Sequence, residues 1–472
     1  MPCDSSVADL LVANGKVVFP HLTIEADIAI DDGKICALGS SATLPKADKV
    51  VDAKGSFVLP SCIDPHVHIN TQFMGASTKD DFFTATKATS SGGTTTIVDF
   101  ATQQKGDLPL KAVQDRRAQA DGKVAIDYSL HTVITDLTPE AVAQLKQLID
   151  YGLPSFKLFM VYRKEGLMVD DGVLFKVFME ATSHGGLVVL HAENAAMIEF
   201  LVDEALRKER REAIYHALTR PPITEAEAVH RALFIANYLG APYYNLHLSI
   251  RQGVDMFREA RRRGQPVYAE TCTHYLINTM DDLRGPNGIN FICTPPLRTK
   301  EDQEALWAGL ADGTLSAVSS DHEAFTTDMK KIGKDSFDKV PNGLPGHEFR
   351  LPVLFSEGVG KGRISVNRLS EITSTNIAKI VGLYPKKGAI ALGSDADLVI
   401  LDPKLEKTIT PEESLYEMDW YPFEGMRVKG WPVVTISKGK IIWENGKFQG
   451  KQGEGEFLKR KLPPELSKRV IA

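Results

Sequence analysis

The chain has 472 residues, of which 43% are hydrophobic and 25% are charged, and its formal net charge at pH 7 is -6. This length exceeds what one hydrophobic core usually organises, so we expect one large domain and a smaller one. The small negative charge, without any block of basic residues, gives no electrostatic argument for nucleic acid or an anionic membrane as a partner. A small, neutral or weakly charged substrate is expected instead.

The first residues, 1–6, carry neither a basic region nor an apolar run of signal-peptide length. No later stretch approaches the roughly 20 apolar residues of a membrane span. The 5 cysteines are scattered and show no Cys-x-x-Cys spacing, which argues against a disulfide framework. We therefore expect a cytoplasmic protein with no membrane segment.

Short β-rich runs alternate with turn signals at the beginning of the chain, in residues 10–18 and 26–35. Asn14-Gly15 and Asp32-Gly33 interrupt these runs, and such dipeptides are strong hairpin signals. The same pattern of short β-rich runs and turn signals occurs near the other end of the chain, in residues 396–401, 433–436 and 440–447. We infer one small β-sandwich domain built from both termini around an inserted catalytic domain. Two unrelated β extensions are the alternative.

Between about residues 59 and 383, β-rich segments alternate with helical ones. Residues 92–100 indicate a buried strand, and residues 110–117 indicate part of the helix that follows it. Such alternation predicts parallel strands with crossover helices, and a segment of this length suits a (β/α)8 barrel.

The expected organisation has four parts. They are a first part of the β-sandwich domain in residues 1–58, the barrel in 59–383, a second part of the β-sandwich in 384–450, and a C-terminal tail in 451–472. The tail is charged, and Leu462-Pro463-Pro464 breaks any long helix. Loose packing of the tail and contact with another subunit are both left open.

The chemistry is centred on Asp64-Pro65-His66-Val67-His68, which follows an apolar run. Side chains on an extended chain repeat every second residue, so the two imidazole rings point the same way, as a bound cation requires. Taken alone, a His-x-His pair can equally be a surface or core pair.

Four more apolar segments each end in a group that can bind or assist a metal, namely Lys157, His191, His247 and Asp321. One βα unit takes roughly 31 residues if about 250 are shared by eight. On this spacing, and with a helical insertion over residues 197–219, His66 and His68 follow strand 1. The later groups follow strands 4, 5, 6 and 8, and all face the mouth of the barrel that carries active sites.

Histidines and an aspartate are ligands that suit zinc, manganese, iron or cobalt. Lys157 alone would be read as a surface cation or an ion-pair partner, but its apolar neighbours predict burial, which favours a neutral, nucleophilic amine. Such an amine can capture carbon dioxide as a carbamate whose two oxygens bridge two metals. We therefore expect a centre with two divalent ions per subunit, with zinc favoured, and N6-carboxylysine at Lys157.

Two metals about 3.5 to 4 Å apart acidify the water between them. We assign His66, His68 and Asp321 to one ion, His191 and His247 to the other, and carbamylated Lys157 to both. Asp321 can also pass a proton to the leaving nitrogen. Tyr162, on the loop after Lys157, could donate to the developing oxyanion, although a packed loop tyrosine is the competing interpretation.

Nearly the whole chain resembles the dihydropyrimidinase and hydantoinase group of the cyclic amidohydrolases. The resemblance rests on Asp64-Pro65-His66-Val67-His68, Gly92-Gly93-Thr94-Thr95, Ser155-Phe156-Lys157, His191-Ala192-Glu193-Asn194, Glu270-Thr271-Cys272, Ser320-Asp321-His322, Pro341-Asn342-Gly343 and residues 387–398. It implies a binuclear metal barrel, a carbamylated lysine at Lys157, an oxyanion tyrosine at Tyr162 and hydrolysis of a small cyclic amide. It further implies that backbone groups at Thr294 and Asn342 bind the ring, and that the subunits form a homo-oligomer, a tetramer or a dimer.

Several residues depart from close relatives and leave the ring and its substituent undefined. Thr294 stands where serine is usual and Thr273 where proline is usual, Glu323 follows Asp321-His322, and His347 stands where we expect an aliphatic residue. Asn70 occupies the place of the arginine that holds a substrate carboxylate in dihydroorotases, so an uncharged dihydropyrimidine or 5-substituted hydantoin is favoured. An allantoinase or cyclic imide hydrolase is the alternative. A non-catalytic assembly protein of this fold is disfavoured because all six ligand positions are filled.

Overall fold

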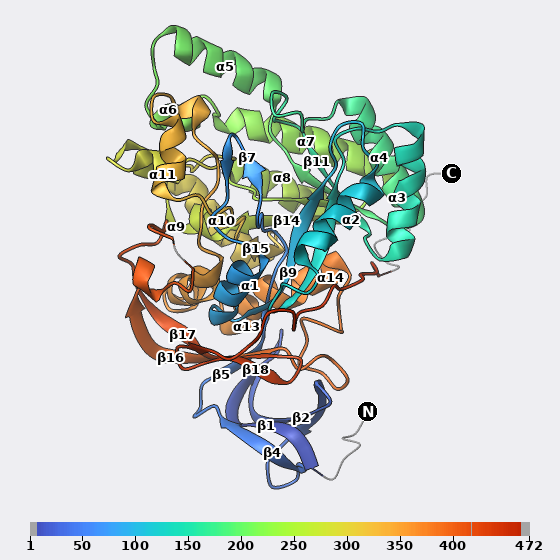
Figure 1. Cartoon of the computed structure of the whole chain (residues 1–472), viewed down its shortest axis with the longest axis vertical. Coiled ribbons are helices and arrows are strands. Elements are labelled where there is room, and N and C mark those ends of the chain that lie inside the picture. Colours follow the sequence, from blue (N-terminus) through green and yellow to red (C-terminus); the bar gives the residue numbers. More distant parts are fainter. Residues whose placement is uncertain (1–6, 417, 464–472) are drawn as a thin grey trace.

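The computed structural model describes residues 7–416 and 418–463. Its main part is an eight-stranded sheet in the order β15-β14-β13-β12-β11-β10-β9-β6, and every neighbouring pair is parallel (Figure 1). The strands are β6 (Cys62–Asp64), β9 (Thr94–Thr102), β10 (Asp127–Val133), β11 (Ser155–Phe159), β12 (Leu187–His191), β13 (Tyr243–Asn245), β14 (Val267–Cys272) and β15 (Ala317–Ser319).

The two outer strands of this sheet meet just beyond their carboxyl ends. Val67 forms a parallel bridge with His322, and the His68 N–H donates to the His322 carbonyl at 2.8 Å. This contact closes the sheet into the expected (β/α)8 barrel and brings the ends of β6 and β15 together.

Helices occupy the crossovers between the barrel strands, as the alternating pattern predicts, and further helices, from α11 onward, follow the last barrel strand, β15. They are α1 (Phe82–Ser91), α2 (Pro109–Ala120), α3 (Pro139–Tyr151), α4 (Asp171–His184), α5 (Ala195–Arg207), α6 (Ile214–Leu218), α7 (Pro222–Leu239), α8 (Arg251–Arg262), α9 (Thr273–Ile277), α10 (Lys300–Asp312), α11 (Thr327–Lys330), α12 (Arg350–Leu354), α13 (Val366–Ser370) and α14 (Asn376–Val381). The expected insertion after His191 is real and consists of α5 and α6. Side-chain caps start several helices; Asp170, for example, accepts from the Val173 N–H at the start of α4.

A second sheet is built from strands near both ends of the described chain. Its order is β19-β18-β17-β16-β5-β1-β2-β3, with β4 pairing with β1. Its strands are β1 (Val7–Val18), β2 (Thr23–Asp31), β3 (Lys34–Gly39), β4 (Lys46–Asp52), β5 (Phe57–Pro60), β16 (Leu398–Thr408), β17 (Arg427–Ser437), β18 (Lys440–Glu444) and β19 (Lys447–Phe448). Figure 1 shows these first and last strands side by side beyond one end of the barrel. The expectation of one separate sheet domain from both ends is therefore confirmed, and two unrelated extensions are excluded.

The expected hairpin at Asn14-Gly15 is wrong. β1 runs continuously through both residues, with a register shift against β2 between Val12 and Gly15 and a φ of 57° at Asn14. Gly15 is needed here because a Cβ at this position would lie 2.5 Å from Val58 Cγ2. The dipeptide therefore forms a bulge that lets β5 approach, whereas Asp32-Gly33 does turn the hairpin between β2 and β3.

The described part of the tail, residues 451–463, is not loosely packed. The Tyr128 N–H donates to the Glu456 carbonyl at 2.9 Å, the Leu458 N–H donates to the Tyr128 carbonyl at 2.7 Å, and Leu458 and Arg460 are buried. This segment therefore lies along β10 of its own barrel. Residues 464–472, the rest of the expected tail, lie outside the described residues.

Cys62, Cys272 and Cys293 are free and buried, whereas Cys36 is disulfide-bonded, which the cysteine pattern did not predict. Residues 1–6, on which the expectation about a leader segment depends, lie outside the described residues. None of the helices in the described ranges combines the length and apolar character that a membrane crossing requires.

Candidate active site

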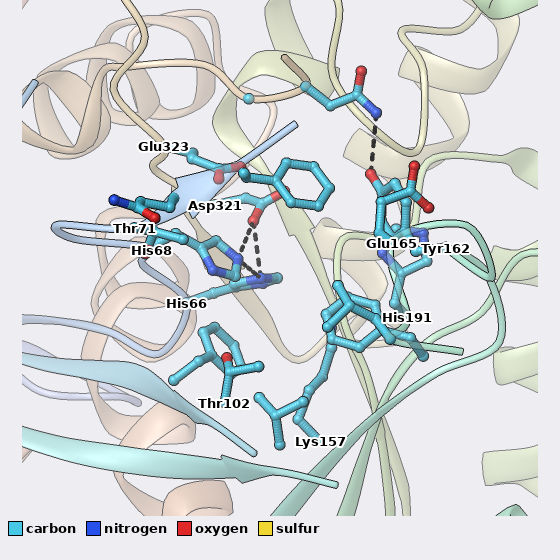
Figure 2. Close-up of a pocket in the computed structure, with 18 of the residues that line it drawn as sticks. His66, His68, Thr71, Thr102, Lys157, Tyr162, Glu165, His191, Asp321 and Glu323 are labelled. Atoms are coloured by element: carbon cyan, nitrogen blue, oxygen red, sulfur yellow. Dashed lines mark hydrogen bonds and ion pairs between the residues drawn. The ribbon is translucent and has the colours of Figure 1, made fainter. Parts of the chain in front are cut away.

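The residues singled out from the strand ends line one cavity of about 610 Å³ at the carboxyl ends of the barrel strands (Figure 2). His191 is the last residue of β12, His247 follows β13 by two residues, and Asp321 follows β15 by two residues. Lys157 differs slightly from the expectation, because it lies inside β11 rather than after it. These groups come from different strands, and the closed barrel places them in one pocket.

The two histidines of the His-x-His motif do point the same way. Their Nε2 atoms lie 3.2 Å apart. Asp321 Oδ1 lies 2.8 Å from His66 Nε2 and 3.3 Å from His68 Nε2. The three donor atoms therefore converge on one point.

His191 and His247 form a second group beside the first. Their ring centroids lie 4.4 Å apart, and the ring of His247 lies 5.3 Å from that of His66. Donor atoms of His66, His247 and Asp321 all fall within 4.8 Å of one another. Imidazole and carboxylate donors at this spacing suit divalent ions such as zinc, so these residues are able to hold a metal centre.

Lys157 is buried between aromatic rings, as its apolar neighbours predict. Its Nζ lies 4.5 Å from the ring centroid of Phe159 and 5.5 Å from that of Phe100. Within the described part of the chain, no residue forms a hydrogen bond or ion pair with this Nζ. Burial lowers the pKa of Lys157 to about 7, since water no longer stabilises the ammonium. The interpretation of Lys157 as a surface cation is therefore wrong.

Two buried glutamates hold the histidine rings, and sequence reasoning gave them no role. Glu270 Oε1 lies 2.7 Å from His66 Nδ1, and Glu193 Oε2 lies 2.7 Å from His191 Nε2. Each carboxylate takes one ring nitrogen and leaves the other free for a ligand. The only sequence signal was that Glu193 stands two residues after His191 and that Glu270 lies in a strand-end motif.

Backbone conformation at the site is unusual. Tyr162, His247 and Asp321 have φ values of 67°, 38° and 49°, in the left-handed region that residues with a Cβ rarely adopt. Such conformations persist where the surrounding structure enforces them, and they are frequent at functional sites.

Tyr162, Thr294 and Asn342 form a connected edge of the cavity. Asn342 Nδ2 donates to Tyr162 Oη at 3.2 Å and to Thr294 Oγ1 at 2.8 Å. The Tyr162 ring also contacts His191 and Phe73 edge to face, with centroid distances of 5.5 and 5.1 Å. Burial raises the pKa of the Tyr162 hydroxyl, so this group stays protonated and can donate a hydrogen bond.

A second buried lysine, which the sequence did not single out, joins the two loops that carry Thr294 and Asn342. Lys330 Nζ donates to the carbonyls of Ile292 and Pro341, both at 2.7 Å. Burial lowers the pKa of Lys330 to about 7. Because its contacts are to backbone oxygens, this side chain sets the spacing of the loops.

The four departures from close relatives divide into two groups. Thr294 and Glu323 line the cavity, whereas Thr273 and His347 are buried and do not line it. His347 stacks on His322, with ring centroids 3.7 Å apart, and His322 Nε2 lies 3.0 Å from Asp80 Oδ2. Only Thr294 and Glu323 can therefore act on a bound molecule directly.

Comparison with known proteins agrees with this geometry. The profile described as "Amidohydrolase family" matches residues 57–442. A D-hydantoinase of Geobacillus stearothermophilus is 43% identical over 454 residues, which is 95% of this chain and 96% of that protein.

Solved structures agree as well. The crystal structure of the dihydropyrimidinase from Brevibacillus agri NCHU1002 has a TM-score of 0.93 at 42% identity, covering 96% of this chain and 98% of that chain. The L-hydantoinase (dihydropyrimidinase) from Arthrobacter aurescens has a TM-score of 0.90 at 32% identity, covering 96% of this chain and 100% of that chain. The chain belongs to the amidohydrolase family, in its dihydropyrimidinase and hydantoinase group.

Proposed function

We propose that the protein is a metal-dependent hydrolase that opens the cyclic amide bond of 5-substituted hydantoins or dihydropyrimidines and releases N-carbamoyl amino acids. The observation that most strongly supports this function is the convergence of His66, His68 and Asp321 on one point, beside His191 and His247. The relatives of the chain carry the names of enzymes with this activity.

The proposed centre holds two divalent ions, with zinc as the first choice. His66, His68 and Asp321 would hold one ion, His191 and His247 would hold the other, and Lys157, as N6-carboxylysine, would supply a ligand to both. The burial of Lys157 and the lack of an ion-pair partner among the described residues support this modification. When bound, such ions lower the pKa of water and so supply a nucleophile at neutral pH.

The side chains around the centre have separate tasks in this proposal. The Tyr162 hydroxyl donates a hydrogen bond to the amide oxygen as negative charge develops on it. Asp321 accepts a proton from the attacking water and delivers it to the ring nitrogen as the C–N bond of the amide breaks. Backbone groups at Thr294 and Asn342 hold the amide edge of the ring, which places its carbonyl near Tyr162.

A substrate panel tests the proposal. We expect the purified, metal-loaded protein to hydrolyse dihydrouracil or a 5-aryl hydantoin faster than allantoin or succinimide, which represent the alternative substrates. Elemental analysis of the same sample should give about two metal ions per chain, the number in two-metal hydrolytic sites. Far fewer ions, together with no hydrolysis of any cyclic amide, would instead support a non-catalytic assembly protein.

The remaining expectations stay predictions. They are zinc as the native metal, assembly as a homotetramer or dimer, a cytoplasmic location, and the domain boundaries at residues 58/59, 383/384 and 450/451.

A further inference from the structure

Two carboxylates in the active-site cavity have no role in the proposed metal centre. Glu323 and Glu165 line the cavity on opposite walls, Glu323 beside Asp321 and Glu165 beside Tyr162 (Figure 2). Neither carboxylate has a hydrogen bond or ion pair with another residue in the described ranges. An unpaired carboxylate inside a cavity is costly unless something brings a donor to it.

The cationic side chains that line the cavity cannot supply that donor. Arg116 Nε donates to Asp99 Oδ2 at 2.7 Å, and its remaining nitrogens donate to Gln119 and to the Ile69 carbonyl. Lys157, the other basic residue of the lining, belongs to the proposed metal centre. Among the described lining residues, no basic side chain is therefore free to meet a negative substituent.

Other acids of the lining are already paired. Asp107 and Asp115 lie 3.2 and 2.7 Å from Lys111 Nζ, and Asp321 contacts His66 and His68. The lining acids that have no partner among the described residues are thus Glu323 and the more exposed Glu165. Burial and the neighbouring Asp321 raise the pKa of Glu323 well above its usual range, so a cation placed beside this carboxyl group would stabilise its ionised form.

Glu323 lies next to the loop that is proposed to hold the ring. Its N–H donates to the Leu344 carbonyl at 3.0 Å, which fixes the start of the side chain. A Cβ added to Gly343 would lie 2.8 Å from Glu323 Oε2, so the carboxylate covers the backbone just after Asn342. A ring held at Asn342 therefore has the Glu323 carboxylate at its border.

We propose that Glu323 selects cyclic amides whose ring substituent carries a positive charge. This inference rests on the proposed function and adds the class of substituent to it. A protonated amine on the substituent gives the unpaired carboxylate a charge-assisted hydrogen bond. A carboxylate on the substituent meets like charge and has no free basic side chain to bind it.

Three hydantoins of matched size test the inference. They carry 3-aminopropyl, butyl and 2-carboxyethyl groups at C5. For the wild type we expect kcat/KM to be at least about tenfold higher for the aminopropyl than for the butyl compound, where tenfold corresponds to ~1.4 kcal/mol. The carboxyethyl compound should be the slowest of the three.

The variant Glu323→Gln keeps the size of the side chain and removes its charge. We expect the aminopropyl-to-butyl ratio of kcat/KM to fall toward one in this variant. Asp107→Asn is the matched control, because it removes a lining carboxylate that already has a partner; its ratio should equal that of the wild type. Thermal unfolding and metal content identify any variant that has failed to fold.

A wild-type ratio of one or less overturns the inference even if Glu323→Gln does not fold. A ratio that is unchanged in a folded Glu323→Gln variant overturns it as well. If the wild type hydrolyses dihydrouracil and the butyl compound without this preference, only the inference fails. If it hydrolyses no cyclic amide, the proposed function fails and the inference falls with it.

Discussion

The carboxylate of Glu270 lies 2.7 Å from Nδ1 of His66, and both side chains are buried. This contact turns Nε2 of His66 toward Asp321 and holds the ring in that orientation. Loss of a carboxylate that orients a metal-binding imidazole typically lowers metal affinity about 10- to 100-fold. We predict that Glu270→Ala lowers metal affinity by about that factor, measured by competition with a chelator.

Glu270→Gln is the control for this prediction, since its amide oxygen can still accept a hydrogen bond from His66. We expect a smaller loss in this variant than in Glu270→Ala. Wild-type metal affinity in a folded Glu270→Ala protein would show that the contact does not orient the ligand.

Lys157→Ala should abolish both metal retention and turnover. The substitution removes the amine that becomes the proposed bridging carbamate, and an alanine offers no oxygen ligand. A short carboxylic acid such as acetate or propionate, added at high concentration, should restore part of both properties because it supplies a carboxylate to the vacated space. Elemental analysis and turnover assays on the same sample are the measurement, and undiminished activity without added acid would refute the role.

Tyr162→Phe should lower kcat more than it changes KM. The loss expected for one oxyanion donor is about 2 to 4 kcal/mol of transition-state stabilisation. Steady-state kinetics on the best substrate measure it, and Tyr384→Phe, which removes a hydroxyl from an exposed tyrosine outside the cavity, is the control. An unchanged turnover rate would remove Tyr162 from the mechanism.

The barrel and the positions of the metal-binding candidates could be predicted because both depend on local patterns. The apolar segments that alternate with helical ones predict the strands, and each candidate metal-binding residue stands at or near the end of such a segment. The (β/α)8 closure then brings these ends together without further information. His66, His191 and Asp321 could thus be placed in one pocket from spacing alone.

Other features depend on packing between distant segments, and spacing does not reveal them. His66 and Glu270 are separated by 204 positions, so their contact follows only from the closed barrel. The Asn14-Gly15 bulge is set by the approach of Val58, which the dipeptide itself does not encode. The role of Lys330 likewise depends on packing between distant segments, because its Nζ donates to the carbonyls of Ile292 and Pro341 on two separate loops.

Lys330 should make stability depend on pH. Burial lowers its pKa from 10.5 to about 7. Between these values the folded state holds Lys330 neutral while the unfolded chain binds a proton there, so the free energy of unfolding rises with pH across this window. Below about pH 7 Lys330 is protonated in both states, so the full cost of burying its cation lowers the free energy of unfolding.

We predict that Lys330→Met removes this contribution. The thermal midpoint of the wild type minus that of the variant should increase as the pH rises from about 7 to 9, which is the lower part of the window. Lys334→Met, at an exposed lysine nearby, should show no such trend. Parallel curves for wild type and Lys330→Met would mean that the lysine titrates alike in the folded and unfolded chains.

Arg460 anchors the described end of the tail beneath the barrel. It donates to Ser129 Oγ at 2.8 Å, Ser155 Oγ at 2.7 Å and the carbonyls of Val381 and Leu130, and it is buried.

Removal of the Arg460 side chain would leave these buried acceptors without a donor, and each such loss costs about 1 to 3 kcal/mol. Arg460→Ala should therefore lower the thermal midpoint strongly, whereas Lys461→Ala, at the exposed next residue, should leave it nearly unchanged. Because Ser155 begins β11, which carries Lys157, we expect metal retention to fall together with stability in Arg460→Ala. Equal midpoints for the two variants would show that the tail adds nothing to the barrel.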